Sequence, residues 1–274
     1  MTSLHFRSIF ISDVHLGTRD CRADFLVDFL ESTESEFLYL VGDIVDLWAM
    51  RRSVHWPPSH TRVLQLIFEK AAKGCRVVYI PGNHDELMRD FVGTEINGVK
   101  ILRDAEHRTN DGRRFFVSHG DEFDTFVRHN GLLRVVGDGI YPFLLMLNRG
   151  FNGLRRRFGH PYWSLASFIK SKVGNARRYM DKYETAVARS AASQDYDGHI
   201  CGHIHKAGIV SRDGILYCND GDWVEHCTAL VEDAEGRLNL LHWADRKQIE
   251  QVSEGMAVEA ALIPLTALGF RHQA

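Results

Sequence analysis

The stretch Pro81-Gly82-Asn83-His84-Asp85-Glu86 follows a short apolar and β-branched run, residues 75–80, which is typical of a buried strand. Pro81 and Gly82 end that strand and turn the backbone. An amide, an imidazole and two carboxylates then lie on the loop that follows the strand. Because ligands in open α/β sheets bind at the C-terminal ends of the strands, we expect this loop to form part of a functional site.

The same alternation of elements continues on both sides of this loop. Two helices with one apolar face are predicted at residues 22–32 and 61–73. Further strands and strand pairs are predicted at residues 8–12, 37–41, 114–118, 198–201, 208–218 and 227–243. The β-α-β-α-β order of the first hundred residues predicts a layered α/β fold.

Between the strands at residues 114–118 and 198–201 the pattern changes. Residues 126–192 contain no convincing strand, and their apolar residues recur at helical spacing. We therefore predict a helical cap inserted in a single domain of residues 1–250, followed by a tail of residues 251–274.

Composition narrows the class of protein. The 274 residues are 45% hydrophobic and 25% charged, which suits a soluble domain with a substantial core. A net charge of -3 gives no global electrostatic reason to expect nucleic acid binding. No signal-peptide pattern and no run of 18 apolar residues is present, so we expect a cytoplasmic protein. The five cysteines form no C-x-x-C pair and are expected to be reduced, buried thiols.

Side chains that commonly bind metals follow several of the predicted strands: Asp13, His15, Asp43, Asn83, His119, His203 and His205. Carboxylate, imidazole and amide oxygen ligands suit ions such as Mn, Fe and Zn. In the D-x-H and H-x-H pairs, residues i and i+2 of an extended segment point to the same side. A single carboxylate such as Asp43 can bridge two ions about 3.5–4 Å apart. Each pair alone is a weak signal, whereas the whole set predicts a two-metal site.

These blocks resemble the five-block signature of the calcineurin-like metallophosphoesterases. They are Asp13-x-His15, Gly42-Asp43-x-x-Asp46, Gly82-Asn83-His84-Asp85, His119-Gly120-Asp121 and Gly202-His203-x-His205. The blocks occur in the family's order and span residues 13–205. The resemblance implies a four-layer α-β-β-α sandwich and a metal-dependent phosphoester or phosphoanhydride hydrolase.

The resemblance also implies a role for each block residue. The first metal would be held by Asp13, His15 and His205, and the second by Asn83, His119 and His203. Asp43 would bridge the two ions. A bridging hydroxide would then attack phosphorus in line. The general acid would be His84, held by Asp46 beside the scissile phosphate.

The predicted cap indicates the kind of substrate. Residues 149–182 carry nine basic side chains against one acidic side chain, interleaved with aromatic residues, which suits an amphiphile with a phosphorylated head or an anionic membrane surface. A cap at this position resembles the UDP-2,3-diacylglucosamine hydrolases of lipid A synthesis, which typically use Mn and act at the inner face of the cytoplasmic membrane. That resemblance implies substrate contacts at Asp124, Lys170 and Lys172.

One residue departs from that branch, and it keeps alternatives open. Well-known members have Arg after the Asn of the third block, where this chain has His84. A metallophosphodiesterase with another nucleotide-linked lipid as substrate is therefore an alternative. A nuclease would also keep His84, and its basic insert could follow a phosphate backbone. A non-catalytic scaffold, such as the retromer subunit with this fold, is disfavoured because every ligand position is filled.

Overall fold

The computed structural model describes residues 3–124, 157 and 174–245. Seven strands form the larger of two sheets, in the order β12-β11-β1-β2-β3-β5-β4. Their bounds are β1 Leu4–Ile11, β2 Thr33–Val41, β3 Arg76–Ile80, β4 Glu95–Ile96, β5 Val99–Ile101, β11 Thr228–Glu232 and β12 Leu238–His242. The strands β1, β2, β3 and β5 run parallel to one another, and β11 pairs with β1 in the antiparallel direction.

The smaller sheet has five strands in the order β6-β7-β8-β10-β9. Their bounds are β6 Ala105–Arg108, β7 Arg114–Val117, β8 Gly198–Cys201, β9 Gly208–Arg212 and β10 Ile215–Asn219. The three central strands β7, β8 and β10 are parallel. Both predicted hairpins are confirmed, because β9 pairs with β10 and β11 pairs with β12 in the antiparallel direction.

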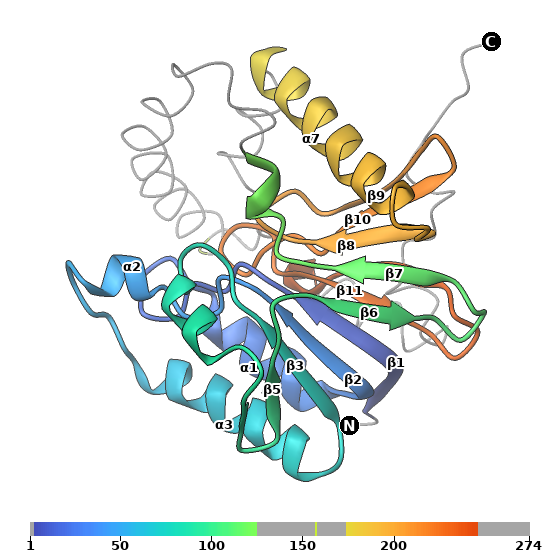
Figure 1. Cartoon of the computed structure of the whole chain (residues 1–274). Helices are drawn as coiled ribbons and strands as arrows, with labels where there is room; N and C mark the ends of the chain where they lie inside the picture. The colour runs from blue at the N-terminus through green and yellow to red at the C-terminus, as the bar shows by residue number, and fades with distance from the viewer. Residues whose placement is uncertain (1–2, 125–156, 158–173, 246–274) are drawn as a thin grey trace.

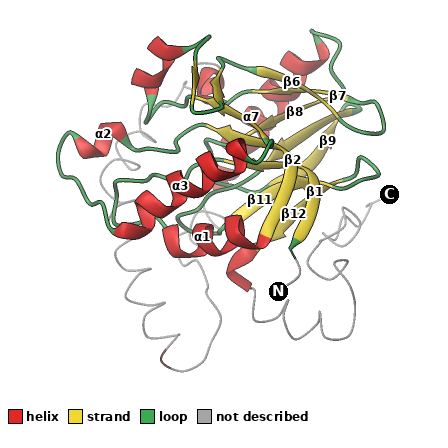
Figure 2. Ribbon diagram, turned by 90° about the horizontal axis from the view of Figure 1, so that it is seen from below, coloured by secondary structure: helices red, strands yellow, loops and turns green. Residues whose placement is uncertain are grey.

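Helices cover the outer faces of the two sheets (Figures 1 and 2). On the larger sheet lie α1 (Ala23–Ser32) and α3 (Pro58–Ala72), whereas α7 (Gly174–Ala192) packs on β8 and β10 of the smaller sheet. Short elements complete the described chain: α2 (Leu47–Met50) and the 3₁₀ turns η1 (Glu86–Phe91), η2 (Asp121–Phe123) and η3 (Trp243–Asp245). The predicted four-layer α-β-β-α sandwich is confirmed.

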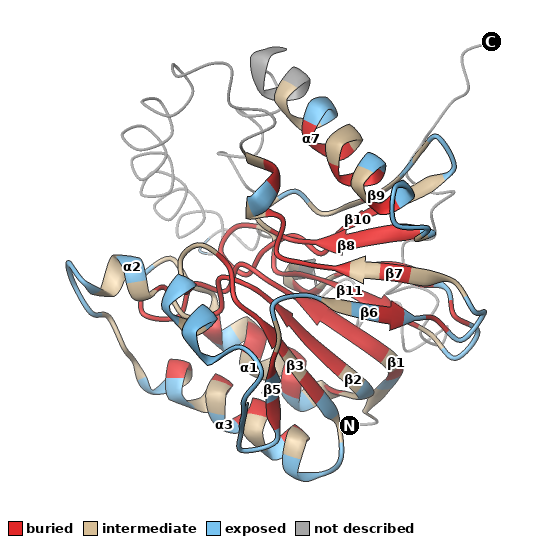
Figure 3. Ribbon diagram, in the orientation of Figure 1, coloured by how far each residue is buried: buried red, intermediate tan, exposed pale blue. Residues whose placement is uncertain are grey.

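Alternating side chains of the central strands bind these layers together. In β1, Ile9 and Ile11 pack in the cluster shared with α1 and α3, whereas Phe10 packs between the two sheets. In β2, Leu38 likewise packs in the cluster shared with α1 and α3, and Tyr39 packs between the two sheets. Both faces of these strands are therefore apolar, which is why they read as unbroken hydrophobic runs in the sequence. Figure 3 shows the central strands as the most buried part of the molecule.

The predicted elements agree with the observed ones except at the sheet margins. The strands β4, β5 and β6 lie outside the strands predicted from the sequence, because each has only two to four residues, too few for an alternating pattern to be detected. The predicted cap, residues 126–192, and the predicted tail, residues 251–274, lie mostly or wholly outside the described residues. Within the range predicted as a cap, residues 174–192 form α7, which is helical as predicted and packs on the smaller sheet as a layer of the sandwich.

The C-terminal ends of parallel strands from both sheets meet along one edge of the sandwich. Backbone hydrogen bonds join neighbouring loops there, from Asp13 N to the Gly42 carbonyl at 3.0 Å and from Gly202 N to the His119 carbonyl at 3.1 Å. The His119 ring crosses between the sheets, and its Nδ1 lies 2.8 Å from the Val41 carbonyl. The loops that carry the predicted site residues are thus brought together.

Candidate dinuclear metal centre

The backbone at this edge is strained at the positions that carry candidate ligands. Five of them have left-handed φ angles between 51° and 69°: Asp13, His15, Asp43, His203 and His205. Such angles are uncommon for residues other than glycine, and they cluster at functional sites. Hydrogen bonds from Val14 N and His15 N to the Asp43 carbonyl, at 3.0 and 2.9 Å, hold two of these loops in place.

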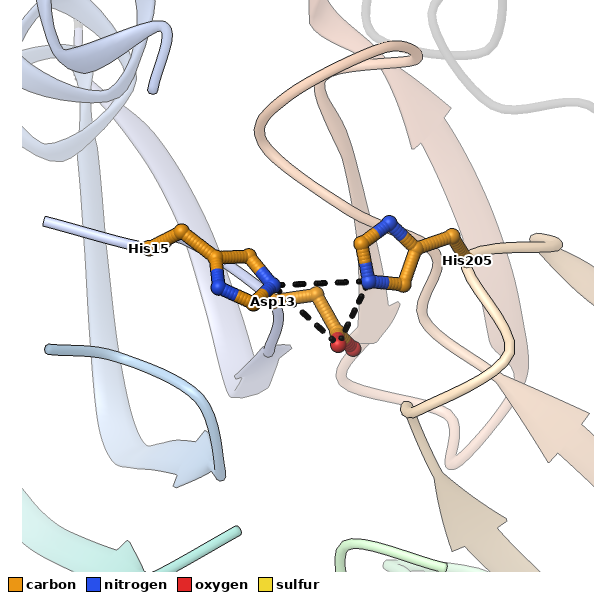
Figure 4. Close-up of side chains that lie close together, drawn as sticks. All are labelled: Asp13, His15 and His205. Carbon is orange, nitrogen blue, oxygen red and sulfur yellow. Dashed lines mark hydrogen bonds and ion pairs between the residues drawn. The ribbon is translucent and has the colours of Figure 1, made fainter. Parts of the chain in front are cut away.

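Asp13, His15 and His205 form the first cluster of candidate ligands. Figure 4 shows the three side chains converging from the loop after β1 and the loop after β8. His205 Nε2 lies 3.0 Å from Asp13 Oδ1 and 3.4 Å from His15 Nε2. The third separation, from His15 Nε2 to Asp13 Oδ1, is 3.9 Å. All three donor atoms could bind a single ion.

Asp43 lies between this first cluster and a second cluster of candidate ligands, which consists of Asn83, His119 and His203. Its Oδ2 is 3.9 Å from His15 Nε2 and 3.4 Å from His119 Nε2. The other oxygen, Oδ1, accepts a hydrogen bond from His84 N at 2.8 Å, which fixes the carboxylate. On the far side, His119 Nε2 lies 3.3 Å from Asn83 Oδ1. Asp43 Oδ2 thus lies between the two clusters, and its role as a bridging ligand stays a prediction.

His203 approaches the second cluster from the other sheet. Its backbone N donates to Asp13 Oδ2 at 2.8 Å, and its ring lies 5.2 Å from the His119 ring, measured between centroids. Its Nε2 is 3.0 Å from Asp124 Oδ1. The structure thus places Asp124, the described member of the predicted substrate contacts, against a candidate metal ligand. Lys170 and Lys172 lie outside the described residues.

His84 lies at the rim of the site, with its imidazole tied to Asp46. The distance from His84 Nδ1 to Asp46 Oδ2 is 3.0 Å, and 27% of the His84 side chain is exposed. Because a carboxylate only accepts hydrogen bonds, Nδ1 carries the hydrogen and Nε2 is left to face outward. In the imidazolium form Nε2 would carry a second hydrogen, which a general acid could donate to a bound substrate, and the contact with Asp46 agrees with the predicted pairing.

Glycines let these groups approach one another closely. A Cβ atom on Gly82 would lie 2.3 Å from Asp43 Oδ1 and 2.7 Å from His119 Nε2. A Cβ atom on Gly202 would lie 2.4 Å from Asp13 Oδ2. A side chain at either of these positions, which precede Asn83 and His203, would therefore collide with a candidate ligand, and only glycine fits.

The charges at the site favour cation binding. Burial alone would raise the pKa of Asp43, but the charge of His119 and its hydrogen bond outweigh burial and hold the pKa well below its usual range. Burial would lower the pKa of His15, but the hydrogen bond to Asp46 and the charges of Asp43 and Asp13 raise it to about 9. The carboxylates are consequently ionised at neutral pH, the state in which they bind divalent ions, whereas His15 would lose its proton when an ion binds to it.

The residues fit two divalent ions. Donor atoms that lie about 2.0–2.2 Å from one ion are separated from one another by roughly 2.8–3.6 Å in octahedral or tetrahedral geometry. The separations of 3.0, 3.4, 3.3 and 3.4 Å given above fall within that range, whereas the two distances of 3.9 Å from His15 Nε2, to Asp13 Oδ1 and to Asp43 Oδ2, exceed it slightly. Asp13 Oδ1 is also buried, and its close neighbour among the described residues, His205 Nε2 at 3.0 Å, is not oriented for a hydrogen bond, which leaves this oxygen available to a cation.

A family model for the calcineurin-like phosphoesterases matches residues 6–207, which include all five blocks. The chain belongs to this family. Membership confirms the predicted enzyme class, a metal-dependent phosphoester hydrolase that uses divalent ions. The individual roles assigned to the ligands, to His84 and to Asp46 stay predictions.

Curated relatives include a UDP-2,3-diacylglucosamine hydrolase of Porphyromonas gingivalis, 26% identical over 245 residues, which cover 82% of this chain and 93% of that protein. Another, from Hamiltonella defensa, is 26% identical over 211 residues, covering 74% and 78%. Similar solved structures include Yfce, a phosphoesterase from E. coli, with 13% identity, a TM-score of 0.45 and coverage of 87% and 93%. Vacuolar Protein Sorting 29 from Cryptosporidium parvum has 12% identity, a TM-score of 0.41 and coverage of 86% and 90%.

Several residues at the site were not found by sequence reasoning. Ser12 Oγ lies 2.5 Å from both Asp13 Oδ2 and Asp220 Oδ1, and its single hydrogen is available to one of the two carboxylates at a time. Trp48, which is 52% exposed, packs edge-on against His84 with 5.5 Å between ring centroids. No spacing rule connects Ser12 with a partner 208 residues away, whereas Trp48 could have been found as an aromatic residue just after the second block.

Proposed function

We propose that this protein hydrolyses the pyrophosphate bond of UDP-2,3-diacylglucosamine and releases UMP and a diacylglucosamine 1-phosphate, a step of lipid A synthesis. The observation that carries the chemistry is the position of Asp43 Oδ2, 3.9 Å from His15 Nε2 and 3.4 Å from His119 Nε2. The name shared by the curated relatives supports the substrate, and the alignment with the P. gingivalis protein covers 93% of its length.

The proposed mechanism assigns a task to each part of the site. The first ion would be held by Asp13, His15 and His205 and the second by Asn83, His119 and His203, with Asp43 between them. When bound, two such ions make hydroxide available near neutral pH and neutralise charge on the phosphate oxygens. His84 would donate a proton through Nε2 to the leaving oxygen, and Asp46 would keep its ring in place.

We further propose Mn²⁺ as the ion, with Fe or Zn as alternatives, and action at the inner face of the cytoplasmic membrane. Among the described residues, no helix is both long and apolar enough to cross a membrane. Contact with the membrane would therefore be peripheral, through the basic and aromatic residues of the predicted cap. Binding of the protein to vesicles with and without anionic lipid tests this part of the proposal.

The test of the reaction uses two substrates with the Mn²⁺-loaded protein: UDP-2,3-diacylglucosamine and the small diester bis-p-nitrophenyl phosphate. We expect release of UMP from the glycolipid, abolished in Asp43→Ala and retained in Asp104→Ala, a control at an exposed loop position. No UMP release, with the small diester still cleaved, would exclude the glycolipid while leaving the two-metal chemistry in place.

That second outcome would favour a related phosphodiesterase, and one observation supports this alternative. His84 stands where the well-known glycolipid hydrolases have Arg, and its imidazole is held by Asp46 rather than extended into solvent. An imidazole can donate a proton to an alkoxide leaving group, which a guanidinium does not do at neutral pH. A panel of nucleotide-linked lipids, other pyrophosphates and single-stranded DNA would then identify the substrate.

A further inference from the structure

Asp124 makes two hydrogen bonds that tie a candidate metal ligand to the helix α7. It follows η2 directly, and its Oδ1 lies 3.0 Å from His203 Nε2 and 3.0 Å from the Tyr179 hydroxyl. The exposed fractions of the Asp124 and His203 side chains are 27% and 14%. The carboxylate therefore points at the imidazole from a half-buried position.

The hydrogen bond determines which nitrogen of His203 is free. A carboxylate only accepts hydrogen bonds, so Nε2 of His203 carries the hydrogen, and Nδ1 holds the lone pair in the neutral ring. His119 is held in the opposite sense, because its Nδ1 faces the Val41 carbonyl at 2.8 Å and its Nε2 faces Asn83 and Asp43. Each imidazole of the second cluster thus has one nitrogen fixed by the protein and the other left free.

The support for Asp124 is itself anchored. Tyr183, one turn after Tyr179 on α7, donates to the Gly120 carbonyl at 3.0 Å and contacts the Phe123 ring edge-on at 6.2 Å between centroids. The helix is therefore attached to both ends of η2, the turn that carries Asp124. A partner fixed in this way loses little freedom when it orients a ligand, so the orientation of His203 costs little free energy.

We propose that Asp124 is a positioning residue of the second metal site, which orients His203 so that Nδ1 binds the ion, and that Tyr179 holds Asp124 for this task. The inference rests on the proposed two-metal function and deepens it. It differs from the substrate contact that the resemblance implies for Asp124. The two roles make opposite predictions, because a positioning residue affects metal affinity for every substrate, whereas a substrate contact affects the KM of one.

The primary experiment measures Mn²⁺ binding to the full chain, without substrate, in wild type, Asp124→Ala, Asp124→Asn and Tyr179→Phe. Loss of a residue that orients a metal ligand typically weakens metal affinity about 10- to 100-fold. We expect a loss of this size at one of two sites in Asp124→Ala and a smaller one in Asp124→Asn, whose amide oxygen can still accept. Tyr179→Phe keeps the carboxylate and should give the smallest loss. Asp104→Ala serves as the control.

Two comparisons assign the loss to the second site. His119→Ala removes a second-site ligand, so the single retained site in Asp124→Ala should have the same affinity as the one retained in His119→Ala. In a double-mutant cycle, Asp124→Ala should add nothing to His203→Ala, because Asp124 acts through that imidazole. Cleavage of bis-p-nitrophenyl phosphate by Asp124→Ala should recover towards the wild-type kcat as Mn²⁺ is raised.

Three results would overturn the inference. Unchanged Mn²⁺ affinities in Asp124→Ala, together with a raised KM for the glycolipid only, would make Asp124 a substrate contact. An equal loss at both sites would point to a general effect on folding. A wild-type chain that binds fewer than two Mn²⁺ would refute the two-metal function and this inference with it, so the two failures are distinguishable.

Discussion

Asp46 Oδ2 lies 2.9 Å from His15 Nδ1 and 3.0 Å from His84 Nδ1, so one carboxylate oxygen accepts hydrogen bonds from two imidazoles with different predicted roles. The other oxygen accepts from Ala49 N at 2.7 Å and caps the short helix α2. The ring of a candidate metal ligand and the ring of the proposed general acid are thus fixed by one side chain.

Asp46→Asn should therefore reduce both metal affinity and turnover. Asn has a single side-chain oxygen, so if that oxygen caps α2, the NH2 group faces the two imidazoles and cannot accept a hydrogen bond from either. We expect Mn²⁺ affinity at the first site to fall about 10- to 100-fold. Turnover should remain reduced even at saturating Mn²⁺, because His84 is also affected. A variant that regains the full wild-type kcat at high Mn²⁺ would show that Asp46 acts on His15 alone.

His84→Ala should separate the two effects. His84 is not among the predicted metal ligands, and His15 keeps its own hydrogen bond to Asp46, so both Mn²⁺ ions should still bind with wild-type affinity. Loss of a general acid typically costs about 10²- to 10⁴-fold in kcat. The loss should be largest for substrates with poor leaving groups and small for nitrophenyl esters, whose leaving group needs no proton. Loss of a metal ion in this variant would count against the proposed role of His84 as general acid.

His119→Ala should instead empty the second site and leave the first. His119 Nε2 faces Asn83 and Asp43, and its Nδ1 is held by the Val41 carbonyl, so we assign this ring to the second cluster. We expect one Mn²⁺ per chain by metal analysis and very low turnover, because the second cluster loses an imidazole. Retention of two ions at wild-type affinity would remove His119 from the ligand set.

The sequence predicts the candidate ligands because each one follows a strand that is recognisable on its own. Asp13, Asp43 and Asn83 come directly after unbroken apolar runs, and the turn residues beside them mark where each strand ends. The pairing of Asp46 with His84 was implied only by the family resemblance. The contacts of Ser12 with Asp220 and of Asp124 with His203 join segments 208 and 79 residues apart, and no local pattern encodes such pairs.

Gly82→Ala should damage the site through a single added methyl group. The new Cβ would lie 2.3 Å from Asp43 Oδ1 and 2.7 Å from His119 Nε2, so one of these side chains must move. Overpacking of this kind typically costs about 1–3 kcal/mol of stability. We expect a lower Tm and weaker Mn²⁺ binding. Gly208→Ala is the matched control, because its nearest neighbour would be a carbonyl oxygen at 3.9 Å, and it should leave both measurements unchanged.

His199 should make the stability of the fold depend on pH. Burial lowers the pKa of this imidazole to about 3, against 6.5 as its ordinary value. Between these values the unfolded chain binds a proton that the folded chain does not, so stability falls as the pH drops below about 6.5. The loss amounts to roughly 2 kcal/mol at pH 5. The measurement is the free energy of unfolding by denaturant, with a chelator present, at pH 5 and at pH 7.5. The difference in this free energy between the two pH values should be smaller by this amount in His199→Gln than in the wild type. Equal differences in the two proteins would mean that His199 is protonated in the folded state.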